Sequence, residues 1–213
     1  MNNKIPLVLA TRNKHKAKEL QSFLKGLDFE VMTLDNVGQN IELREDGMTF
    51  YDNAIQKARI VFDALHLPSL ADDSGIEVFY LNGRPGVFSA RYAGTNATDE
   101  QNNEKLLAEM RGVPAENRRA QFRSVLALVA DGLERTTEGI CTGILAECPR
   151  GTNGFGYDPI FIPDGFSRTY AELTAEEKNR ISHRSKSFAK MRDVLIEHQE
   201  QLRKSVAKVN SLP

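Results

Sequence analysis

The chain has 213 residues, 40% of them hydrophobic and 27% charged, which supplies enough apolar side chains for a sizeable core. Because 28 Lys and Arg residues balance 29 Asp and Glu residues, net charge gives no reason to expect binding to a nucleic-acid polymer or a membrane. The first apolar run, residues 5–10, is too short for a signal peptide or a membrane span, and the two cysteines form neither a disulfide framework nor a zinc site. We therefore expect a soluble, cytoplasmic protein.

Alternating strand and helix patterns along the chain predict an α/β fold. In chain order, the predicted elements are a strand at residues 5–10, a helix at 17–27, a strand at 29–34, a helix at 50–65, strands at 69–75 and 76–81, a helix at 98–112, strands at 120–130, 135–147 and 159–163, and helices within 174–202. The strands are indicated by short apolar runs and alternation, and the helices by apolar residues three and four apart. We expect one domain over residues 1–213, with a frayed tail from about residue 205.

Local signals mark where some of these elements begin or turn. Thr49 with Asp52, and Thr174 with Glu177, have the spacing of a capping box at a helix N-terminus. An Asp-Gly pair at 131–132 separates the two longest predicted strands and indicates a hairpin. These signals predict helix starts after both threonines and a tight turn at the pair.

Two adjacent carboxylates, Asp72 and Asp73, lie at the end of an apolar run. Like charges so close need a cation or hydrogen-bond donors nearby, and carboxylates are ligands that Mg²⁺ prefers. Glu45 and Asp46, in a predicted loop, offer further carboxylates. If a strand runs through both aspartates, only one of them faces a given site, whereas a turn brings both in. The plainer alternative is a strand that ends in a turn with both carboxylates in water.

The polar segment between the first predicted strand and helix has the features of an anion site. Thr11 and Asn13 can cap the helix, whose first backbone N–H groups are suited to binding an anion. The same segment carries the basic side chains Arg12, Lys14, His15 and Lys16. The glycines of a Walker A loop are missing, so the alternative is an ordinary helix cap with solvated lysines.

Two later segments also carry residues suited to ligand binding. Residues 151–157 combine three glycines with Phe155 and Tyr157, so the backbone can approach a ligand and an aromatic ring can stack on a base. His183 and Arg184 lie where one predicted helix gives way to the last, and a guanidinium suits carbonyl and phosphate oxygens. The alternatives are a flexible surface loop with both rings packed beneath it, and an exposed helix start.

Six motifs are informative as a set, because they occur in a particular order and spacing. They are TRNKHK, EDGMTFYDNAIQKA, ADDSG, PGVFSARY, GTNGFGYDPIF and AELTAEEKNRISHRSKS. Together, from about Lys4 to the final helix, they make the chain resemble the inosine/xanthosine triphosphate pyrophosphatases. The resemblance implies hydrolysis of ITP, dITP and XTP to monophosphate and pyrophosphate with Mg²⁺, in a homodimer. It further implies an elongated α/β fold with a long central mixed sheet and two lobes around a substrate cleft.

The same resemblance implies roles for individual residues. Asp73 would be the general base and a metal ligand, and Glu45 a second metal carboxylate. The substrate-binding residues would be Thr11, Arg12, Asn13, Lys14, His15, Lys16, Ser74, Phe155, Gly156, Tyr157, Asp158, Lys178, His183 and Arg184. Within this set, residues 11–16 would bind the triphosphate, and Phe155 would stack on the base.

One position departs from the family pattern. Arg12 stands where many members carry a small residue, often Gly. Its guanidinium either adds a phosphate contact or points into solvent, so the departure concerns the phosphate geometry and not the assignment.

Three rival interpretations remain. A Maf-type enzyme acts on pyrimidine or modified nucleotides, but its SxSPRR-like opening turn is absent here. A regulatory module that senses a purine triphosphate without cleaving it does not require a base beside the metal. A structural or interaction protein leaves the glycine-rich loop and the carboxylates unexplained.

Overall fold

The computed structural model describes residues 4–38 and 41–209. Within it the chain forms two compact units. Unit 1 comprises residues 1–73, 125–138 and 187–213, and unit 2 comprises residues 74–124 and 139–186. The expectation that these units act as one domain, with a substrate cleft, stays a prediction.

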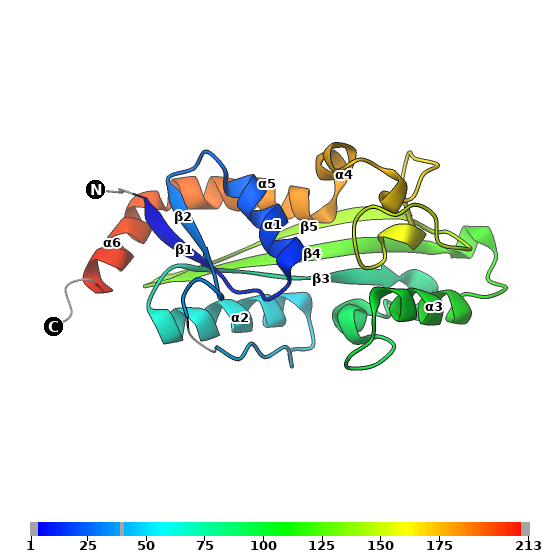
Figure 1. Cartoon of the computed structure of the whole chain (residues 1–213), viewed down its shortest axis with the longest axis horizontal. Helices are drawn as coiled ribbons and strands as arrows, with labels where there is room; N and C mark the ends of the chain where they lie inside the picture. Colours follow the sequence, from blue (N-terminus) through cyan, green and yellow to red (C-terminus); the bar gives the residue numbers. More distant parts are fainter. Residues whose placement is uncertain (1–3, 39–40, 210–213) are drawn as a thin grey trace. The chain divides into compact units, whose positions relative to one another are not determined.

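A mixed six-stranded sheet forms the framework of the fold (Figure 1). Its strands are β1 (Ile5–Leu9), β2 (Phe29–Thr33), β3 (Ser69–Val78), β4 (Arg119–Ala130), β5 (Leu133–Leu145) and β6 (Phe161–Pro163), in the order β2-β1-β3-β4-β5-β6. β1 pairs in parallel with β2 and β3, whereas β5 and β6 are antiparallel. The predicted α/β fold with a mixed sheet is therefore confirmed, and β3, β4 and β5 each contribute residues to both units.

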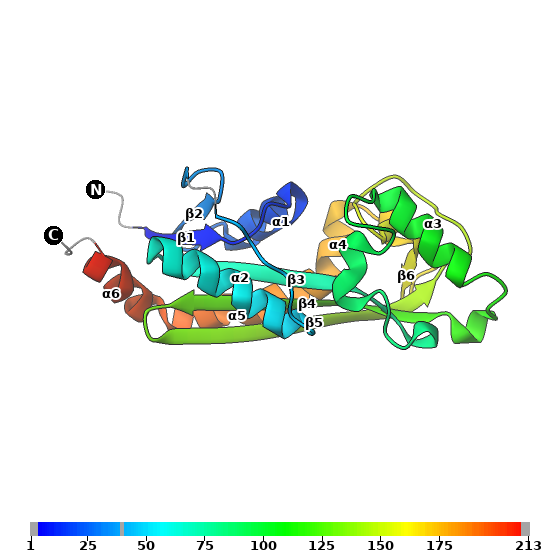
Figure 2. The same ribbon diagram turned by 90° about the horizontal axis from the view of Figure 1, so that it is seen from below.

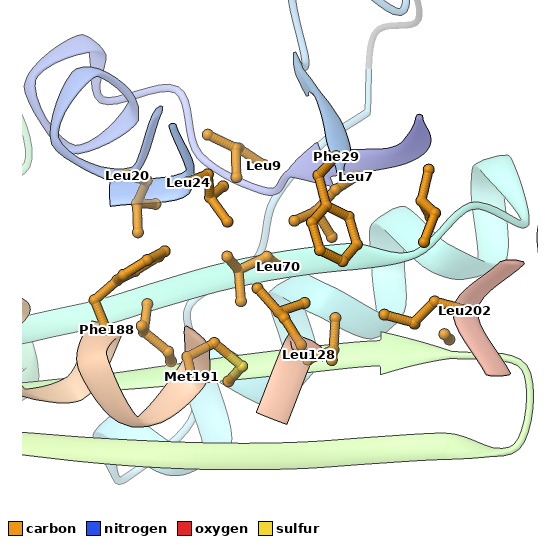
Figure 3. Close-up of a cluster of buried hydrophobic side chains, with 14 of the residues drawn as sticks. Leu7, Leu9, Leu20, Leu24, Phe29, Leu70, Leu128, Phe188, Met191 and Leu202 are labelled. Carbon is orange, nitrogen blue, oxygen red and sulfur yellow. The ribbon is translucent and has the colours of Figure 1, made fainter. Parts of the chain in front are cut away.

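Unit 1 packs helices around β1 and β2. Its helices are α1 (Lys14–Leu24), α2 (Phe50–Leu65), most of α5 (His183–Glu197) and α6 (Gln199–Val209). Leu7, Val8 and Leu9 are all fully buried, and because consecutive strand residues point to opposite faces, both faces of β1 are covered. Leucines of β1, β3 and β4 meet Phe188 and Met191 of α5 in one apolar cluster (Figure 3). This core fixes the strand that carries Asp72 and Asp73.

Unit 2 has its own apolar cluster beneath α3 (Asp99–Glu109) and α4 (Ala175–Ile181). Leu106 and Met110, on and just after α3, are fully buried in it, together with Phe161 of β6 and Tyr170. Figure 2 shows α3 beside the segment that leads into β6, as Figure 1 does. Among the described residues, no helix is long and apolar enough to cross a membrane.

The strand and turn predictions are mostly confirmed. β4 and β5 are joined by the Asp131–Gly132 pair, so the predicted hairpin forms there. The two predicted strands at 69–75 and 76–81 are instead one strand, β3, which ends at Val78. Residues 79–81 form a 3₁₀ turn, so the prediction of a strand there is wrong.

The predicted helix starts are also found. Thr174 and Glu177 form a reciprocal capping box at the start of α4. Thr49 caps α2 by accepting the Asp52 backbone N–H at 3.1 Å, and its hydroxyl donates to the Asp52 carboxylate at 2.7 Å. Both helices therefore begin directly after the predicted threonine caps.

The prediction of a frayed tail from residue 205 is wrong for residues 205–209, which belong to α6. Ser205 is buried, and its hydroxyl accepts a hydrogen bond from the Asp131 backbone N–H at 3.3 Å. Leu202, one turn earlier, lies in the core of unit 1. Residues 210–213 of the predicted tail lie outside the described residues.

Candidate active site

The two adjacent aspartates lie within β3, and each has a lysine partner of its own. Asp72 Oδ2 lies 2.9 Å from Lys16 Nζ, and Asp73 Oδ1 lies 2.9 Å from Lys57 Nζ. Both aspartates are buried, with 1% and 6% of their surface exposed. Because β3 runs straight through them, their side chains leave opposite faces of the strand. The alternative in which both carboxylates lie in water at a strand end is wrong.

The Lys57 ammonium brings together the two carboxylates predicted to bind metal. Lys57 Nζ donates to Glu45 Oε1 at 2.8 Å and to Asp73 Oδ1 at 2.9 Å, and also to the Asp72 carbonyl oxygen at 2.8 Å. Burial by itself lowers the pKa of Lys57, but attraction to Asp73 and Glu45 outweighs it, so the pKa is raised. Glu45 and Asp73 thus converge on a single positive charge.

Asp73 has the environment of a proton acceptor. Burial raises the pKa of Asp73 above its ordinary value, although Lys57 and then Lys16 oppose that rise. The Asn53 amide donates to Asp73 Oδ2 at 3.2 Å, so each carboxylate oxygen has a donor. A carboxylate whose pKa is raised toward neutrality is suited to general-base work. These contacts also fix the orientation of the Asp73 side chain.

The carboxylates of Glu45 and Asp73 fit a magnesium ion whose other ligands come from a phosphate chain. Among residues 4–38 and 41–209, no group of three or more His, Cys, Asp or Glu side chains could hold a metal ion. Mg²⁺ is usually held by one or two carboxylates, with substrate phosphates and waters completing the shell. Glu45 and Asp73, which already point at one cation, match that requirement.

Residues 11–13 lead into α1, which begins at Lys14, three residues before the predicted helix start, and the predicted cap at Asn13 is found. Asn13 is the N-cap: its side-chain oxygen accepts the backbone N–H groups of His15 and Lys16 at 3.0 and 3.1 Å. The Thr11 hydroxyl in turn accepts the Asn13 backbone N–H at 3.1 Å. Arg12 Nη2 donates to the Ile41 carbonyl at 2.7 Å, so this guanidinium braces the neighbouring loop. Lys14 and His15 are exposed.

Unit 2 collects a second set of predicted residues around the Phe155 ring. Lys178 Nζ and Arg184 Cζ each lie 5.0 Å from the centre of that ring. Lys178 forms a buried ion pair with Asp158 at 2.6 Å, and Arg184 Nη2 donates to Ser74 Oγ at 2.8 Å. Two cations therefore flank an aromatic ring on a glycine-rich loop, an arrangement suited to a planar, oxygen-bearing ligand.

Tyr157 and His183 point into the protein. Tyr157 is buried and donates its phenol to the Ser89 carbonyl at 2.8 Å, and burial raises its pKa. His183 is 1% exposed and stacks on Phe122 with ring centres 4.7 Å apart. The alternative of an exposed helix start at His183 is therefore wrong, and the alternative of a packed ring holds for Tyr157.

Two residues that contact Asp73, Asn53 and Lys57 of α2, are not among those predicted from the sequence. They are four residues apart and lie on the same face of α2 as the apolar residues Ala54 and Ala58, all of which are buried. An amide and an ammonium within an otherwise apolar helix face need partners, because burial of an unpaired polar group is costly. That interruption of the apolar stripe was the available signal.

Comparison with known proteins places the chain in a family. Residues 7–194 match the model of the Ham1 family. The chain belongs to the Ham1 family. A Geobacter sulfurreducens relative named dITP/XTP pyrophosphatase is 48% identical, over 89% of this chain and 96% of that protein. A Bacillus subtilis relative of the same name is 46% identical, over 88% of this chain and 96% of that protein.

Solved structures of the Ham1 family share the fold. The Staphylococcus aureus Ham1 protein matches with a TM-score of 0.83 at 38% identity, over 91% of this chain and 99% of that one. A HAM1 protein from Coxiella burnetii has the same TM-score at 41% identity and the same coverage. The resemblance drawn from the six motifs is thereby confirmed.

Proposed function

We propose that this chain hydrolyses the non-canonical purine nucleotides ITP, dITP and XTP to the monophosphate and pyrophosphate. The observation that carries the proposal is the convergence of Glu45 and Asp73 on Lys57, with a buried Asp73 whose pKa is raised. The names of the Ham1 relatives at 46–48% identity support the substrate class. The enzyme is then a nucleoside-triphosphate pyrophosphohydrolase.

Unit 1 supplies the groups that act on the triphosphate. Asp73 orients and deprotonates the attacking water, and Lys16, with residues 11–15 around it, binds the phosphate chain. Glu45 and Asp73 would hold Mg²⁺, which when bound neutralises charge on the phosphates and on the pyrophosphate leaving group. Lys57 holds both carboxylates in place. Each group then has a role that its contacts in the structure favour.

Unit 2 supplies the groups that select the base. Phe155 stacks on the purine. The rest of its loop is formed by Gly156, Tyr157 and Asp158. The proposed nucleotide-binding residues of this unit are completed by Ser74, Lys178 and His183. Arg184 donates to the 6-oxo group of hypoxanthine or xanthine, while the 6-amino group of adenine offers it only another donor. A site built around such a hydrogen bond rejects the mismatched base, because its polar groups are left unpaired.

The base-reading role of Arg184 makes a direct prediction. Arg184→Ala should reduce the preference for ITP over ATP by roughly 10²-fold or more, as expected when a buried donor is lost. The measurement is kcat/KM for both nucleotides, with Arg180→Ala, an exposed arginine at the end of α4, as the control. An unchanged ITP-to-ATP ratio would remove Arg184 from base reading.

The family resemblance also supports proposals about assembly and location. We propose a homodimer that acts in the cytoplasm, on free nucleotides and not on a nucleic-acid polymer or a membrane. Light scattering coupled to size-exclusion chromatography tests the dimer, because a monomer at micromolar concentration contradicts it.

The deciding experiment is pyrophosphate release from ITP, dITP, XTP, GTP, ATP and dTTP, with Mg²⁺ and then with EDTA. Metal-dependent release from the first three alone is the expected result. Release from dTTP instead would move the assignment to the Maf-type alternative. Binding of ITP without release would favour the sensing module.

A further inference from the structure

The loop that carries Phe155 depends on support from outside itself. Gly151, Gly154 and Gly156 have φ values of 80°, 80° and 63°, a region that side chains disfavour. Glycines with this freedom make a loop mobile unless contacts fix it, since the entropy of ordering them is high. Phe155 lies between two of them, and its own backbone N–H donates to Asp158 Oδ2 at 2.9 Å. The position of its ring therefore depends on that bond and on how the two neighbouring glycines are held.

Both polar groups of the Gly156 backbone are held by one turn of α3. The Asp99 carboxylate accepts the Gly156 N–H at 2.7 Å, and the Asn103 amide donates to the Gly156 carbonyl at 2.9 Å. The N–H belongs to the peptide plane shared with Phe155, and the carbonyl to the plane shared with Tyr157. Because both peptide planes are held, the φ and ψ of Gly156 are fixed. The orientation of the backbone at Phe155, from which its side chain extends, is fixed with them.

Helix α3 is itself firmly anchored, so it can transmit rigidity to the loop. The Asn102 side chain accepts the Ala93 backbone N–H at 2.8 Å and donates to the Ala90 carbonyl at 3.3 Å. Lys105 donates to the Tyr92 carbonyl at 2.6 Å. Leu106, one turn after Asn102 and Asn103 on the same side of α3, is fully buried in the core of unit 2. Helix α3, which Figure 2 labels, is therefore an anchored support for Asp99 and Asn103.

We propose that Asp99 and Asn103 are positioning residues that set the Phe155 ring for base stacking. The inference rests on the proposed function, because it assigns these two residues to the selection of the base in that same site. Asp99, Asn103 and the loop that they hold all belong to unit 2, whereas the residues proposed to act on the phosphates belong to unit 1. Their loss weakens binding of the base and leaves the hydrolytic step intact.

The test uses Asp99→Ala, which removes an exposed side chain and the acceptor of the Gly156 N–H. We expect KM for dITP to rise roughly tenfold with kcat within about twofold, the pattern of lost binding and not of lost chemistry. Binding of IMP should weaken by the same factor, whereas inorganic tripolyphosphate, which has no base, should bind as to the wild type. Asn103→Asp, which turns an acceptor toward the Gly156 carbonyl, should give the same pattern.

Two further variants separate positioning from a general effect on the helix. Asp99→Asn keeps an acceptor, so the KM rise should shrink to about threefold, since a neutral acceptor bonds roughly half as strongly. Glu100→Ala removes the other acid of the first turn of α3, where both acids favour the helix dipole, and should leave KM unchanged.

Three results would overturn the inference: wild-type KM in Asp99→Ala, an equal loss of tripolyphosphate binding, or a fall in kcat with KM unchanged. If the wild-type chain releases no pyrophosphate from dITP, the proposed function fails. The positioning role of Asp99 and Asn103 is then judged by IMP binding alone. Failure of IMP binding in the wild type overturns the positioning inference, while pyrophosphate release alone decides the proposed function.

Discussion

The two units of this Ham1 protein hold their functional residues by different means. In unit 1, Asp73 lies within a buried strand, Lys57 and Asn53 lie on a helix, and short hydrogen bonds connect them. In unit 2, Phe155 lies on a loop of glycines and is held by contacts from elsewhere in that unit. The residues proposed to move protons and hold charge lie on a strand and a helix, whereas the residue proposed to contact the base lies on a loop that neighbouring residues hold in place.

The first prediction tests the chemical side of that comparison. Asp73→Asn should lower kcat for dITP by about 10²- to 10⁴-fold, because the variant keeps the shape of the side chain and loses its basicity. Steady-state kinetics, with circular dichroism as a check on folding, provide the measurement. Asp63→Asn, an exposed acid on α2, is the control. Wild-type kcat in Asp73→Asn would exclude Asp73 from catalysis.

The second prediction concerns the cost of the buried charges in unit 1. Lys57→Met should reduce the free energy of unfolding by roughly 3–5 kcal/mol, because it leaves the Asp73 carboxylate buried without its ammonium partner. Urea denaturation measures the loss. The double variant Lys57→Met with Asp73→Asn should recover part of it, since the buried residue 73 is then neutral and only Glu45, whose side chain is 37% exposed, loses its partner. Equal stability of the single and double variants would contradict this account.

The third prediction sharpens the comparison from the side of the loop. At Gly154 an added Cβ would collide with the Asp158 carboxylate, which also pairs with Lys178, whereas at Gly156 it would meet no atom within 4 Å. Both glycines have positive φ, so both alanine variants have a similar backbone cost of roughly 1–2 kcal/mol. Gly154→Ala should therefore raise KM for dITP more than Gly156→Ala. Equal KM values would show that backbone strain alone decides.

The smallest expected effect is a pH dependence at the start of α4. The hydrogen bond from Arg168, and then the Thr174 backbone N–H, lower the pKa of Glu177 to about 2. Its ionised form therefore stabilises the fold above the ordinary carboxyl pKa, and that contribution disappears as the pH falls toward 2. Melting temperatures of the wild type and Glu177→Gln should differ slightly at pH 7 and converge at pH 2. A difference that persists at pH 2 would contradict the assignment.

Sequence patterns predicted local features well and long-range contacts poorly. The hairpin at 131–132 and the capping box at Thr174 depend on residues close in sequence, and both are found. The alternation of Asp72 and Asp73 across a strand was also foreseen as one of two alternatives. The bond between Arg184 and Ser74 joins residues 110 positions apart, and no local pattern indicates it.

Errors arose where tertiary packing overrides a local preference. The stretch after residue 205 is polar enough to suggest a frayed end. Ser205 and Leu202 nevertheless attach α6 to the rest of unit 1. Lys57 was not predicted, because the helix at residues 50–65 was identified from its apolar residues and its caps alone. Its partners come from a loop and a strand, and only the fold brings the three together.

The length of β3 sets the positions of three consecutive polar side chains. Asp72, Asp73 and Ser74 follow one another along this strand, and each meets a different partner: Lys16, Lys57 and Arg184. Adding or removing one residue ahead of Asp72 would turn every later side chain of the strand to the opposite face. The segment is therefore intolerant of length change even where single substitutions are accepted, and lineages of this chain should vary in length in their loops and keep the length of β3 constant.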